Sequence, residues 1–220
     1  NWFAPDGVAP DTVYSFGRQN WFPHVAAEVD ATRSRVAVFD QTSFAKYIVR
    51  GDDALQLLQR LCGNNVDVPE GQAVYTGMFN DRGTFESDLT VVRLAENSFY
   101  LITGTAQAVR DFDWITRNIT NEENVELTDV TASCTVLGVM GPQAPALMEK
   151  LCDSDMTQGA FPFGSSQEVD VGMVTAGALR ITYVGESGWE LHIPTDQGLA
   201  AYDALMEAGA EFGIANAGHY

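Results

Sequence analysis

Apolar residues occur along the chain at two different spacings, which together predict a mixture of helices and strands. Apolar side chains that recur every three or four residues indicate helices, and those that alternate with polar ones indicate strands. The expected helices span residues 23–36, 54–61, 105–119, 142–151 and 196–212. The expected strands span residues 44–50, 74–79, 84–94, 98–102, 125–130, 135–140, 169–174, 179–184 and 189–193.

The order of these elements favours an α+β fold. Strands and helices mix without strict alternation, which favours mainly antiparallel sheets packed by helices over a doubly wound parallel sheet. Residues 1–20 hold two prolines, two glycines and no apolar period, so we expect an extended leader there. Two mixed lobes suit this pattern: a first lobe over residues 1–125, which includes the leader, and a second, truncated lobe over residues 126–220.

Composition and charge narrow the classes of partner. Hydrophobic residues make up 45% of the 220 residues and charged ones 19%, which is a globular composition with enough material for a core. Twelve basic and thirty acidic residues give a net charge of -18, which argues against binding to nucleic-acid phosphates or anionic lipid headgroups. Since no apolar run approaches the roughly 20 residues that cross a bilayer, we expect no membrane association.

Cysteines, histidines and glycines do not predict a metal, disulfide or nucleotide site. The three cysteines are odd in number and widely spaced, so we expect buried free thiols in a reducing compartment. The three histidines lack the spacing of metal ligands, and no metal is expected. Glycine-rich nucleotide motifs and the G-x-S-x-G motif are absent. The residues concerned are Cys62, Cys134, Cys152, His24, His192 and His219.

The strand expected over residues 84–94 carries acids on one face. Alternation places Phe85 with Ser87 on one side and Glu86 with Asp88 on the other. From the residues alone, Glu86 and Asp88 are expected to project into water from a half-exposed sheet.

A second acid follows an aromatic residue within the stretch over residues 179–191. The pattern predicts a hairpin: one strand ends in Tyr183, a glycine-bounded turn follows, and the next strand begins at Trp189. Such a hairpin would present Tyr183 and Glu190 together. An unpaired charge at Glu190 would be costly if it were buried. Its simplest interpretation is an outward-facing residue on an edge strand.

Several ordered motifs resemble those of the aminomethyltransferase (glycine cleavage T-protein) folate-binding family. The stretch VYTGMFNDRG at residues 74–83, followed by ESDLTV at 86–91, is similar to the family signature, and VMGPQ at 139–143 and RITYVGESGWEL at 180–191 match further motifs in the same order. The segments at residues 1–3, 14–22 and 39–44 resemble one branch, the C-terminal portion of dimethylglycine and sarcosine dehydrogenases or oxidases. The likeness covers nearly the whole chain.

The resemblance implies a tetrahydrofolate site. In the family, the aspartate that matches Asp88 lies beside the reactive nitrogens of the reduced folate, where it stabilises positive charge or takes up a proton, so Asp88 is the candidate catalytic residue. The residues that match Tyr183 and Glu190 hold the pterin, whose ring N–H and amino group suit a carboxylate. Tyr75 falls on a family tyrosine near the same pocket. The candidate cofactor-binding residues are therefore Tyr75, Tyr183 and Glu190.

Departures from the family pattern refine this expectation. Gly104 stands where glycine cleavage enzymes have an asparagine, which favours the dehydrogenase branch over a lipoyl-protein role. The small C-terminal β-barrel of the family and one of its arginines would lie beyond Tyr220, so the fold is expected to lack the barrel. Folate is anionic and the chain carries a charge of -18, so the pocket needs local positive charge, for which Arg180 is a candidate.

The resemblance implies capture of a one-carbon unit from an oxidised methylated amine of the dimethylglycine or sarcosine type, giving 5,10-methylenetetrahydrofolate. FAD would be bound only by a separate N-terminal flavin domain of the same polypeptide, whose proximity makes the transfer effectively intramolecular. The expected compartment is the bacterial cytoplasm, or the mitochondrial matrix in a eukaryote. The alternatives are a stand-alone aminomethyltransferase or demethylase of the same family and a non-catalytic folate-binding module.

Overall fold

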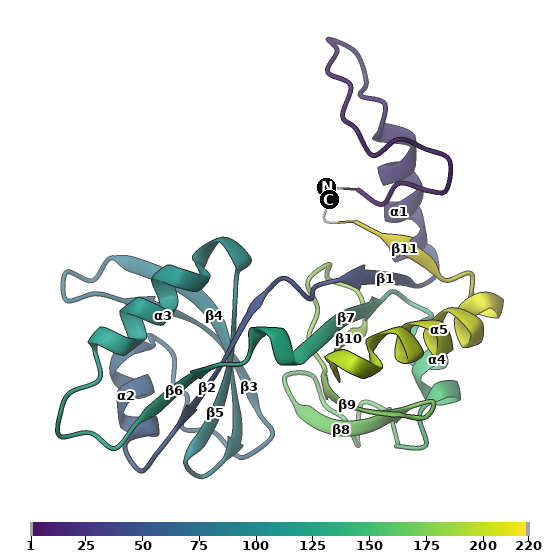
Figure 1. Ribbon diagram of the computed structural model, residues 1–220. Helices are drawn as coiled ribbons and strands as arrows, with labels where there is room; N and C mark the ends of the chain where they lie inside the picture. The colour runs from purple at the N-terminus through teal and green to yellow at the C-terminus, as the bar shows by residue number, and fades with distance from the viewer. Residues whose placement is uncertain (1, 219–220) are drawn as a thin grey trace. The chain divides into compact units, whose positions relative to one another are not determined.

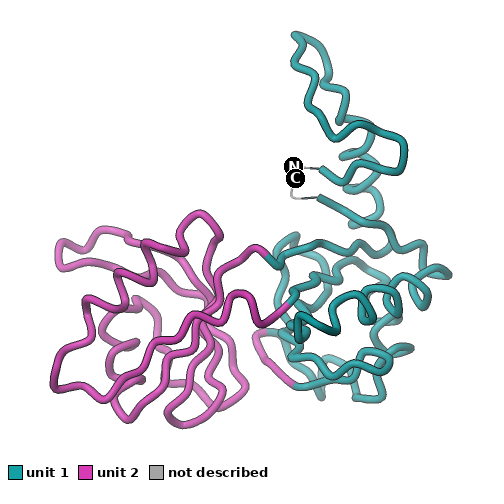
Figure 2. The backbone as a smooth tube through the Cα atoms, in the orientation of Figure 1, with its two compact units in different colours: residues 1–42, 135–163, 168–220 teal, residues 43–134, 164–167 magenta. Residues whose placement is uncertain are grey.

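The computed structural model describes residues 2–218, which fold into two compact units (Figure 1). Unit 1 consists of residues 1–42, 135–163 and 168–220, and unit 2 of residues 43–134 and 164–167 (Figure 2). Each unit has its own sheet and its own hydrophobic core. The predicted α+β class, with two mainly antiparallel sheets packed by helices, is confirmed. Asn1, His219 and Tyr220, which belong to the predicted lobes, lie outside the described residues.

Unit 2 is a five-stranded antiparallel sheet with two helices against one face (Figure 1). Its strands lie in the order β3-β4-β5-β2-β6. The core between helices and sheet contains Leu57, Leu89 and Ile115, none of which is more than 3% exposed. The elements are β2 (Ala45–Arg50), α2 (Ala54–Leu61), β3 (Ala73–Phe79), β4 (Phe85–Ala95), β5 (Ser98–Thr103), the 3-10 turn η1 (Thr105–Gln107), α3 (Ala108–Arg117), β6 (Glu126–Asp129) and the 3-10 turn η2 (Thr131–Ser133).

Unit 1 is built on a six-stranded sheet in the order β11-β1-β7-β10-β9-β8. The helices α4 and α5 cover one face, where Trp189 and Leu191 are buried against Leu147 and Leu205. The helix α1 lies beside β1 and β11 (Figure 1). The elements are α1 (Phe22–Ser34), β1 (Ala37–Asp40), β7 (Cys134–Met140), α4 (Ala144–Leu151), β8 (Ser166–Val171), β9 (Val174–Leu179), β10 (Gly188–Pro194), η3 (Thr195–Gln197), α5 (Gly198–Gly209), η4 (Ala210–Phe212) and β11 (Ala215–Ala217).

The described part of the N-terminal leader, residues 2–21, has no helix or strand, as expected. It is held to the rest of unit 1 by Glu28 of α1, which is 6% exposed. The two carboxylate oxygens of Glu28 accept the backbone N–H groups of Phe3 and Gly218, each at 2.8 Å. These two bonds satisfy a buried charge that would otherwise be costly, and they join the two ends of the described chain to one helix.

The division into units differs from the predicted boundary between residues 125 and 126. The chain leaves unit 1 after residue 42 and returns at residue 135, because β1 pairs in antiparallel fashion with β7 and in parallel fashion with β11. Neither β1 nor β11 was expected, since strands of four and three residues are too short to show a periodicity.

The expected strands over residues 169–174 and 179–184 are shifted in the structure. The chain instead turns sharply after β8, where Gly172 adopts a left-handed conformation with φ of 63°. The next strand, β9, therefore begins at Val174 and ends at Leu179. The expectation of a strand that ends in Tyr183 is wrong, because residues 180–187 form the connection to β10. Across the described residues, no helix is long and apolar enough to span a membrane.

Candidate functional site

Asp88 and Tyr75 lie on the neighbouring strands β4 and β3 of unit 2 and are hydrogen-bonded to each other. The Tyr75 hydroxyl donates to Asp88 Oδ2 at 2.6 Å. Both side chains leave the face of the sheet opposite to the helices, because the alternate residues Ser87 and Leu89 are buried on the helix side. The hydrogen bond to the Asp88 carboxylate raises the pKa of Tyr75, so the phenol remains a donor at neutral pH.

This pair borders a hollow of about 330 Å³ on unit 2. Its volume lies at the lower end of the range for small-molecule sites, which is roughly 300–1,000 Å³. Among the described residues that line it, Asp88 has the one carboxyl group. The lining residues are Gly63, Asn64, Tyr75, Thr76, Gly77, Phe79, Phe85 and Asp88.

A β-bulge brings Phe85 to the same face of the sheet as Asp88. Regular alternation predicted the opposite, and that prediction is wrong, because Met78 pairs with Ser87 whereas Phe79 pairs with Phe85. Glu86 is therefore the extra residue, and the bulge reverses the orientation of the side chain that precedes it. The ring position agrees with this register: a Cβ added to Gly77, directly opposite Asp88, would lie 2.6 Å from Phe85 Cε2.

A buried carboxylate, which the sequence analysis missed, supports the Asp88 strand from the helix side. Asp111 of α3 is 1% exposed, and its Oδ2 accepts hydrogen bonds from the hydroxyls of Ser87, at 2.6 Å, and Thr103. Ser87 precedes Asp88, and Thr103 pairs with Leu89. The sequence did contain a signal for the burial of Asp111. Asp111 stands four residues before Ile115, so it lies on the apolar face of the predicted helix.

Glu190 lies on β10, an interior strand of unit 1 between β7 and β9. The interpretation as an outward-facing residue on an edge strand is wrong, since Glu190 is 9% exposed. His192, two residues further on the same face, brings its Nε2 to 3.8 Å from Glu190 Oε2. Trp189 and Leu191 point to the opposite face and belong to the core.

Tyr183 lies in the connection between β9 and β10 and is 58% exposed. It is therefore not paired with Glu190 across a hairpin, where Leu179 stands instead. The four predicted site residues form two sets: Tyr183 and Glu190 belong to unit 1, and Tyr75 and Asp88 belong to unit 2.

Arg180 is part of the core of unit 1, contrary to the expectation that it supplies positive charge to a folate pocket. It is 8% exposed, and its Nη1 donates to the carbonyl oxygens of Phe161, at 2.6 Å, and Met156, at 3.4 Å. The guanidinium carbon also lies 4.8 Å from the ring centroid of Trp189. Burial lowers the pKa of Arg180.

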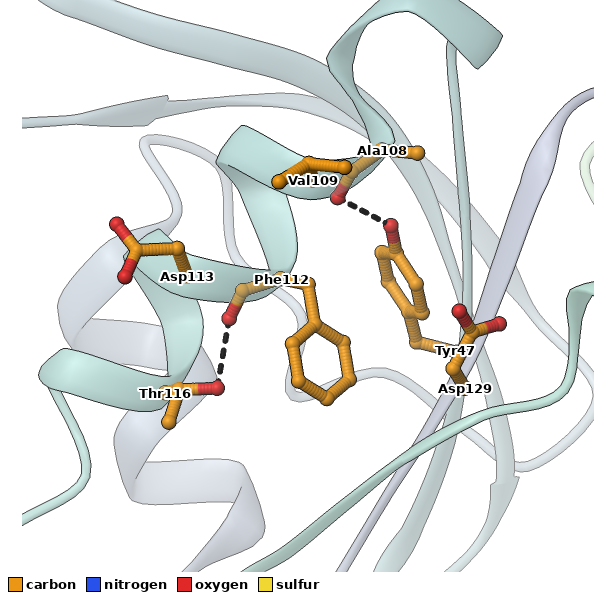
Figure 3. A pocket seen from close by; sticks show the side chains of 7 residues that line it. All are labelled: Tyr47, Ala108, Val109, Phe112, Asp113, Thr116 and Asp129. Atoms are coloured by element: carbon orange, nitrogen blue, oxygen red, sulfur yellow. Dashed lines mark hydrogen bonds between the residues drawn. The ribbon is translucent and has the colours of Figure 1, made fainter.

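A second hollow, of about 450 Å³, opens beside α3 in the same unit (Figure 3). Its floor contains Tyr47 and Phe112, whose rings meet edge to face with centroids 5.5 Å apart. The Tyr47 hydroxyl donates to the carbonyl oxygen of Ala108 at 2.6 Å, and burial with the nearby charges of Asp129 and Asp111 raises the pKa of Tyr47 to about 12. A phenol held in this way has a structural role. None of the predicted site residues lines this hollow.

The chain is similar in sequence to parts of larger known proteins. The chain is 36% identical over 225 residues to the mitochondrial pyruvate dehydrogenase phosphatase regulatory subunit of Mus musculus, covering 100% of this chain and 26% of that protein. It is also 36% identical over 223 residues to the mitochondrial dimethylglycine dehydrogenase of Homo sapiens, covering 100% of this chain and 25% of that protein. The chain thus spans about a quarter of the length of these curated relatives.

The fold is shared with a solved structure of the glycine cleavage system aminomethyltransferase T from Bartonella henselae. The two superpose with a TM-score of 0.76 and 22% sequence identity, covering 94% of this chain and 55% of that one. The model of the GCVT N-terminal domain family matches residues 1–220, which is the whole sequence. The chain therefore belongs to the GCVT N-terminal domain family.

Proposed function

We propose that this chain is a tetrahydrofolate-binding domain that captures a one-carbon unit from an oxidised methylated amine of the dimethylglycine or sarcosine type, giving 5,10-methylenetetrahydrofolate. The observation that carries the proposal is the hydrogen bond from Tyr75 to Asp88 at the hollow of unit 2. Membership of the aminomethyltransferase-type family and 36% identity to a dimethylglycine dehydrogenase support it.

The polar groups of unit 1 fit a pterin. The Glu190 carboxylate is nearly buried and lies 3.8 Å from His192, beyond hydrogen-bond distance, and it accepts no hydrogen bond from the described residues. A carboxylate with this spare acceptor capacity suits the ring N–H and amino group that a pterin presents side by side. We assign Glu190 and the exposed Tyr183 to holding the pterin.

Tetrahydrofolate supplies the nitrogen atoms that take up the one-carbon unit. Asp88 is the group in unit 2 that can stabilise positive charge or take up a proton there. Tyr75 donates to one oxygen of Asp88, which holds that carboxylate in one orientation and leaves the other oxygen available. Tyr75 is thus a positioning residue for Asp88 in this proposal.

Other parts of the reaction belong to the longer polypeptide in this proposal. The chain spans 25% of the human dimethylglycine dehydrogenase, so oxidation of the amine at FAD is assigned to a separate flavin domain of the parent chain. The expected compartment is the cytoplasm of a bacterium or, in a eukaryote, the mitochondrial matrix, and two of the relatives are named mitochondrial proteins.

A non-catalytic folate-binding module is the second candidate. It is favoured by the 36% identity to a protein named as a regulatory subunit, equal to the identity to the dehydrogenase. The two candidates differ in one measurable property: the module binds tetrahydrofolate without accelerating its condensation with a one-carbon donor.

Two measurements test the proposal. Anaerobic calorimetry measures the affinity for tetrahydrofolate. A kinetic assay with formaldehyde as the one-carbon donor measures the rate of 5,10-methylenetetrahydrofolate formation, after the rate of the uncatalysed condensation has been subtracted. Glu190→Gln should weaken binding by about 10- to 100-fold, because a charge-assisted pair of hydrogen bonds is lost. Asp88→Asn should lower the rate by about 100-fold or more and change binding much less. Glu168→Gln, an exposed glutamate of the same sheet, is the matched control. Unchanged binding and rate in both site variants would refute the assignment.

A further inference from the structure

A buried glutamine lies near Glu190 on the face of the unit 1 sheet that is turned away from α4 and α5. Gln41, directly after β1, is 8% exposed, and its backbone N–H donates to the carbonyl oxygen of Val136 at 2.9 Å. The side-chain Oε1 of Gln41 is buried and has no hydrogen-bond donor among the described residues. A buried amide oxygen without a donor costs free energy, which indicates that a ligand supplies the donor.

A glycine makes room for this amide. Leu137 and Val139 pack in the core on the helix side, so Gly138 between them faces the opposite side of the sheet. A Cβ added to Gly138 would lie 2.5 Å from Gln41 Oε1. The amide of Gln41 thus occupies the space that a larger residue at position 138 would fill.

Two backbone contacts define the register of β7 against its neighbour β10. The backbone N–H of Gly141 donates to the carbonyl oxygen of Ser187 at 2.8 Å. One residue further into the sheet, a Cβ added to Gly188 would lie 2.9 Å from Met140 Cα. Residue numbers fall along β7 as they rise along β10, so the two strands run antiparallel.

Continued by two residues, this register pairs Gly138 of β7 with Glu190 of β10. Directly opposed residues of antiparallel strands turn their side chains to the same face, with Cβ positions about 4.5–5.5 Å apart. Gln41 Oε1 lies within 2.5 Å of the Cβ position of Gly138. The Gln41 amide and the Glu190 carboxylate are therefore neighbours on one face of the sheet.

Together the two side chains offer three oxygen acceptors: Oε1 of Gln41 and both carboxylate oxygens of Glu190. None of these oxygens accepts a hydrogen bond from the described residues, and His192 Nε2 stands 3.8 Å from Glu190 Oε2. A ligand here must present donors, since a carbonyl or anionic group would face oxygen atoms alone. The pterin ring of folate has three N–H bonds on one edge, one on a ring nitrogen and two on the 2-amino group. The donors of this edge match the acceptors of the site in number.

We infer that Gln41 is a specificity-determining residue for the pterin, whose 2-amino group donates one N–H to Gln41 Oε1. The inference rests on the proposed function, because it names a further contact of the same bound folate. Glu190 accepts the ring N–H and the other N–H of the amino group. The site then selects a 2-amino pterin over a ring that lacks this amino group.

Two ligands that differ only at the 2-position of the ring test this on the full 220-residue chain. Tetrahydrofolate carries the amino group, and 2-desamino-2-methyltetrahydrofolate carries a methyl group of similar size in its place. Anaerobic calorimetry of the wild-type chain should show a preference for tetrahydrofolate of about 100-fold or more, because the methyl compound leaves two acceptors without donors.

Substitutions at Gln41 then locate the preference. Gln41→Met keeps the length of the side chain over Gly138 and removes the amide. It should weaken tetrahydrofolate binding by about tenfold and leave binding of the methyl compound no weaker, so that the preference falls to about tenfold or less. Gln41→Leu should have the same effect. Gln197→Leu, which replaces an exposed glutamine of unit 1, is the matched control and should leave both affinities unchanged.

Thermal unfolding without ligand distinguishes a binding role from a structural one. Removal of a buried acceptor that has no donor should leave the Tm of Gln41→Met unchanged or raise it. A glutamine that stabilised the sheet would instead lower the Tm when replaced, and both ligands would then bind more weakly by the same factor. That combination would overturn the inference.

The outcomes also separate this inference from the proposed function. If Glu190→Gln weakens tetrahydrofolate binding while Gln41→Met keeps the wild-type preference for the 2-amino ring, the inference is overturned and the proposed function stands. If neither compound binds to the wild-type chain, the proposed function is refuted, and this inference with it. A preference that depends on both Glu190 and Gln41 would support both.

Discussion

Replacing Asp111 by alanine should destabilise unit 2 by an amount that its hydrogen bonds allow us to work out. Asp111 accepts from Ser87 and Thr103 in a site from which water is excluded. Hydrogen bonds to a charged acceptor contribute about 1.5–3 kcal/mol each, so the gross loss is about 3–6 kcal/mol.

Two effects reduce this loss. The Ser87 hydroxyl also lies 2.6 Å from Gln107 Oε1, and the Thr103 hydroxyl lies 3.4 Å from the carbonyl oxygen of Asp88, so both donors have a second acceptor in reach. Removing a buried carboxylate also removes its desolvation penalty. We therefore expect Asp111→Ala to lower the free energy of unfolding by about 2–3 kcal/mol. Asp111→Asn, which keeps one acceptor oxygen, should cost about half as much.

Urea unfolding measures this difference, and hydrogen exchange of the β4 and β5 amides locates it. The matched control is Asp113→Ala, two residues further along α3, where an exposed carboxylate pairs with Arg117. An exposed pair of this kind contributes about 0–1 kcal/mol. The reasoning would be refuted if Asp111→Ala and Asp113→Ala shifted the unfolding free energy equally, or if exchange in β4 and β5 did not change.

Two further predictions concern buried titratable groups. Burial raises the pKa of Cys62 to about 12 and that of Cys152 to about 11. A thiol reagent at pH 8 should therefore modify only the half-buried Cys134 until the protein is unfolded. A second fast-reacting thiol in the native chain would contradict this. Because the pKa of Tyr47 is raised to about 12, the folded state holds this proton more tightly than the unfolded state, whose tyrosine pKa is about 10. The contribution of this proton to the free energy of unfolding is present below pH 10 and is lost between about pH 10 and 12. Tyr47→Phe should therefore flatten the decline of the unfolding free energy at alkaline pH. Parallel declines in the wild-type and variant proteins would disprove this.

Local periodicity predicted the helices and the longer strands well. The helix α2 has the expected bounds, and the other four helices lie within about two residues of their expected spans once their 3-10 turns are included. Alternation likewise predicted which face of β4 carries Asp88. These successes have one cause: a side chain's position on a helix or a strand follows from its neighbours within a few residues.

Features that depend on pairing between distant segments were not predictable in this way. The bulge that turns Phe85 toward Asp88 depends on the register of β4 against β3. The burial of Glu190 depends on β7 and β9 lying on either side of β10. Asp111 is tolerated in a core because hydroxyls from β4 and β5 reach it.

The sequence by itself determined the α+β class, the main helices and strands and, through its motifs, the family, and it nominated Tyr75, Asp88, Tyr183 and Glu190 as candidate site residues. The tertiary structure alone decided that Tyr75 bonds to Asp88, that Arg180 serves the core, and that two phenylalanines border the hollow. The physical reason is that hydrogen bonds, burial and ring contacts are properties of residue pairs brought together by sheet order and register, which no short window of sequence contains.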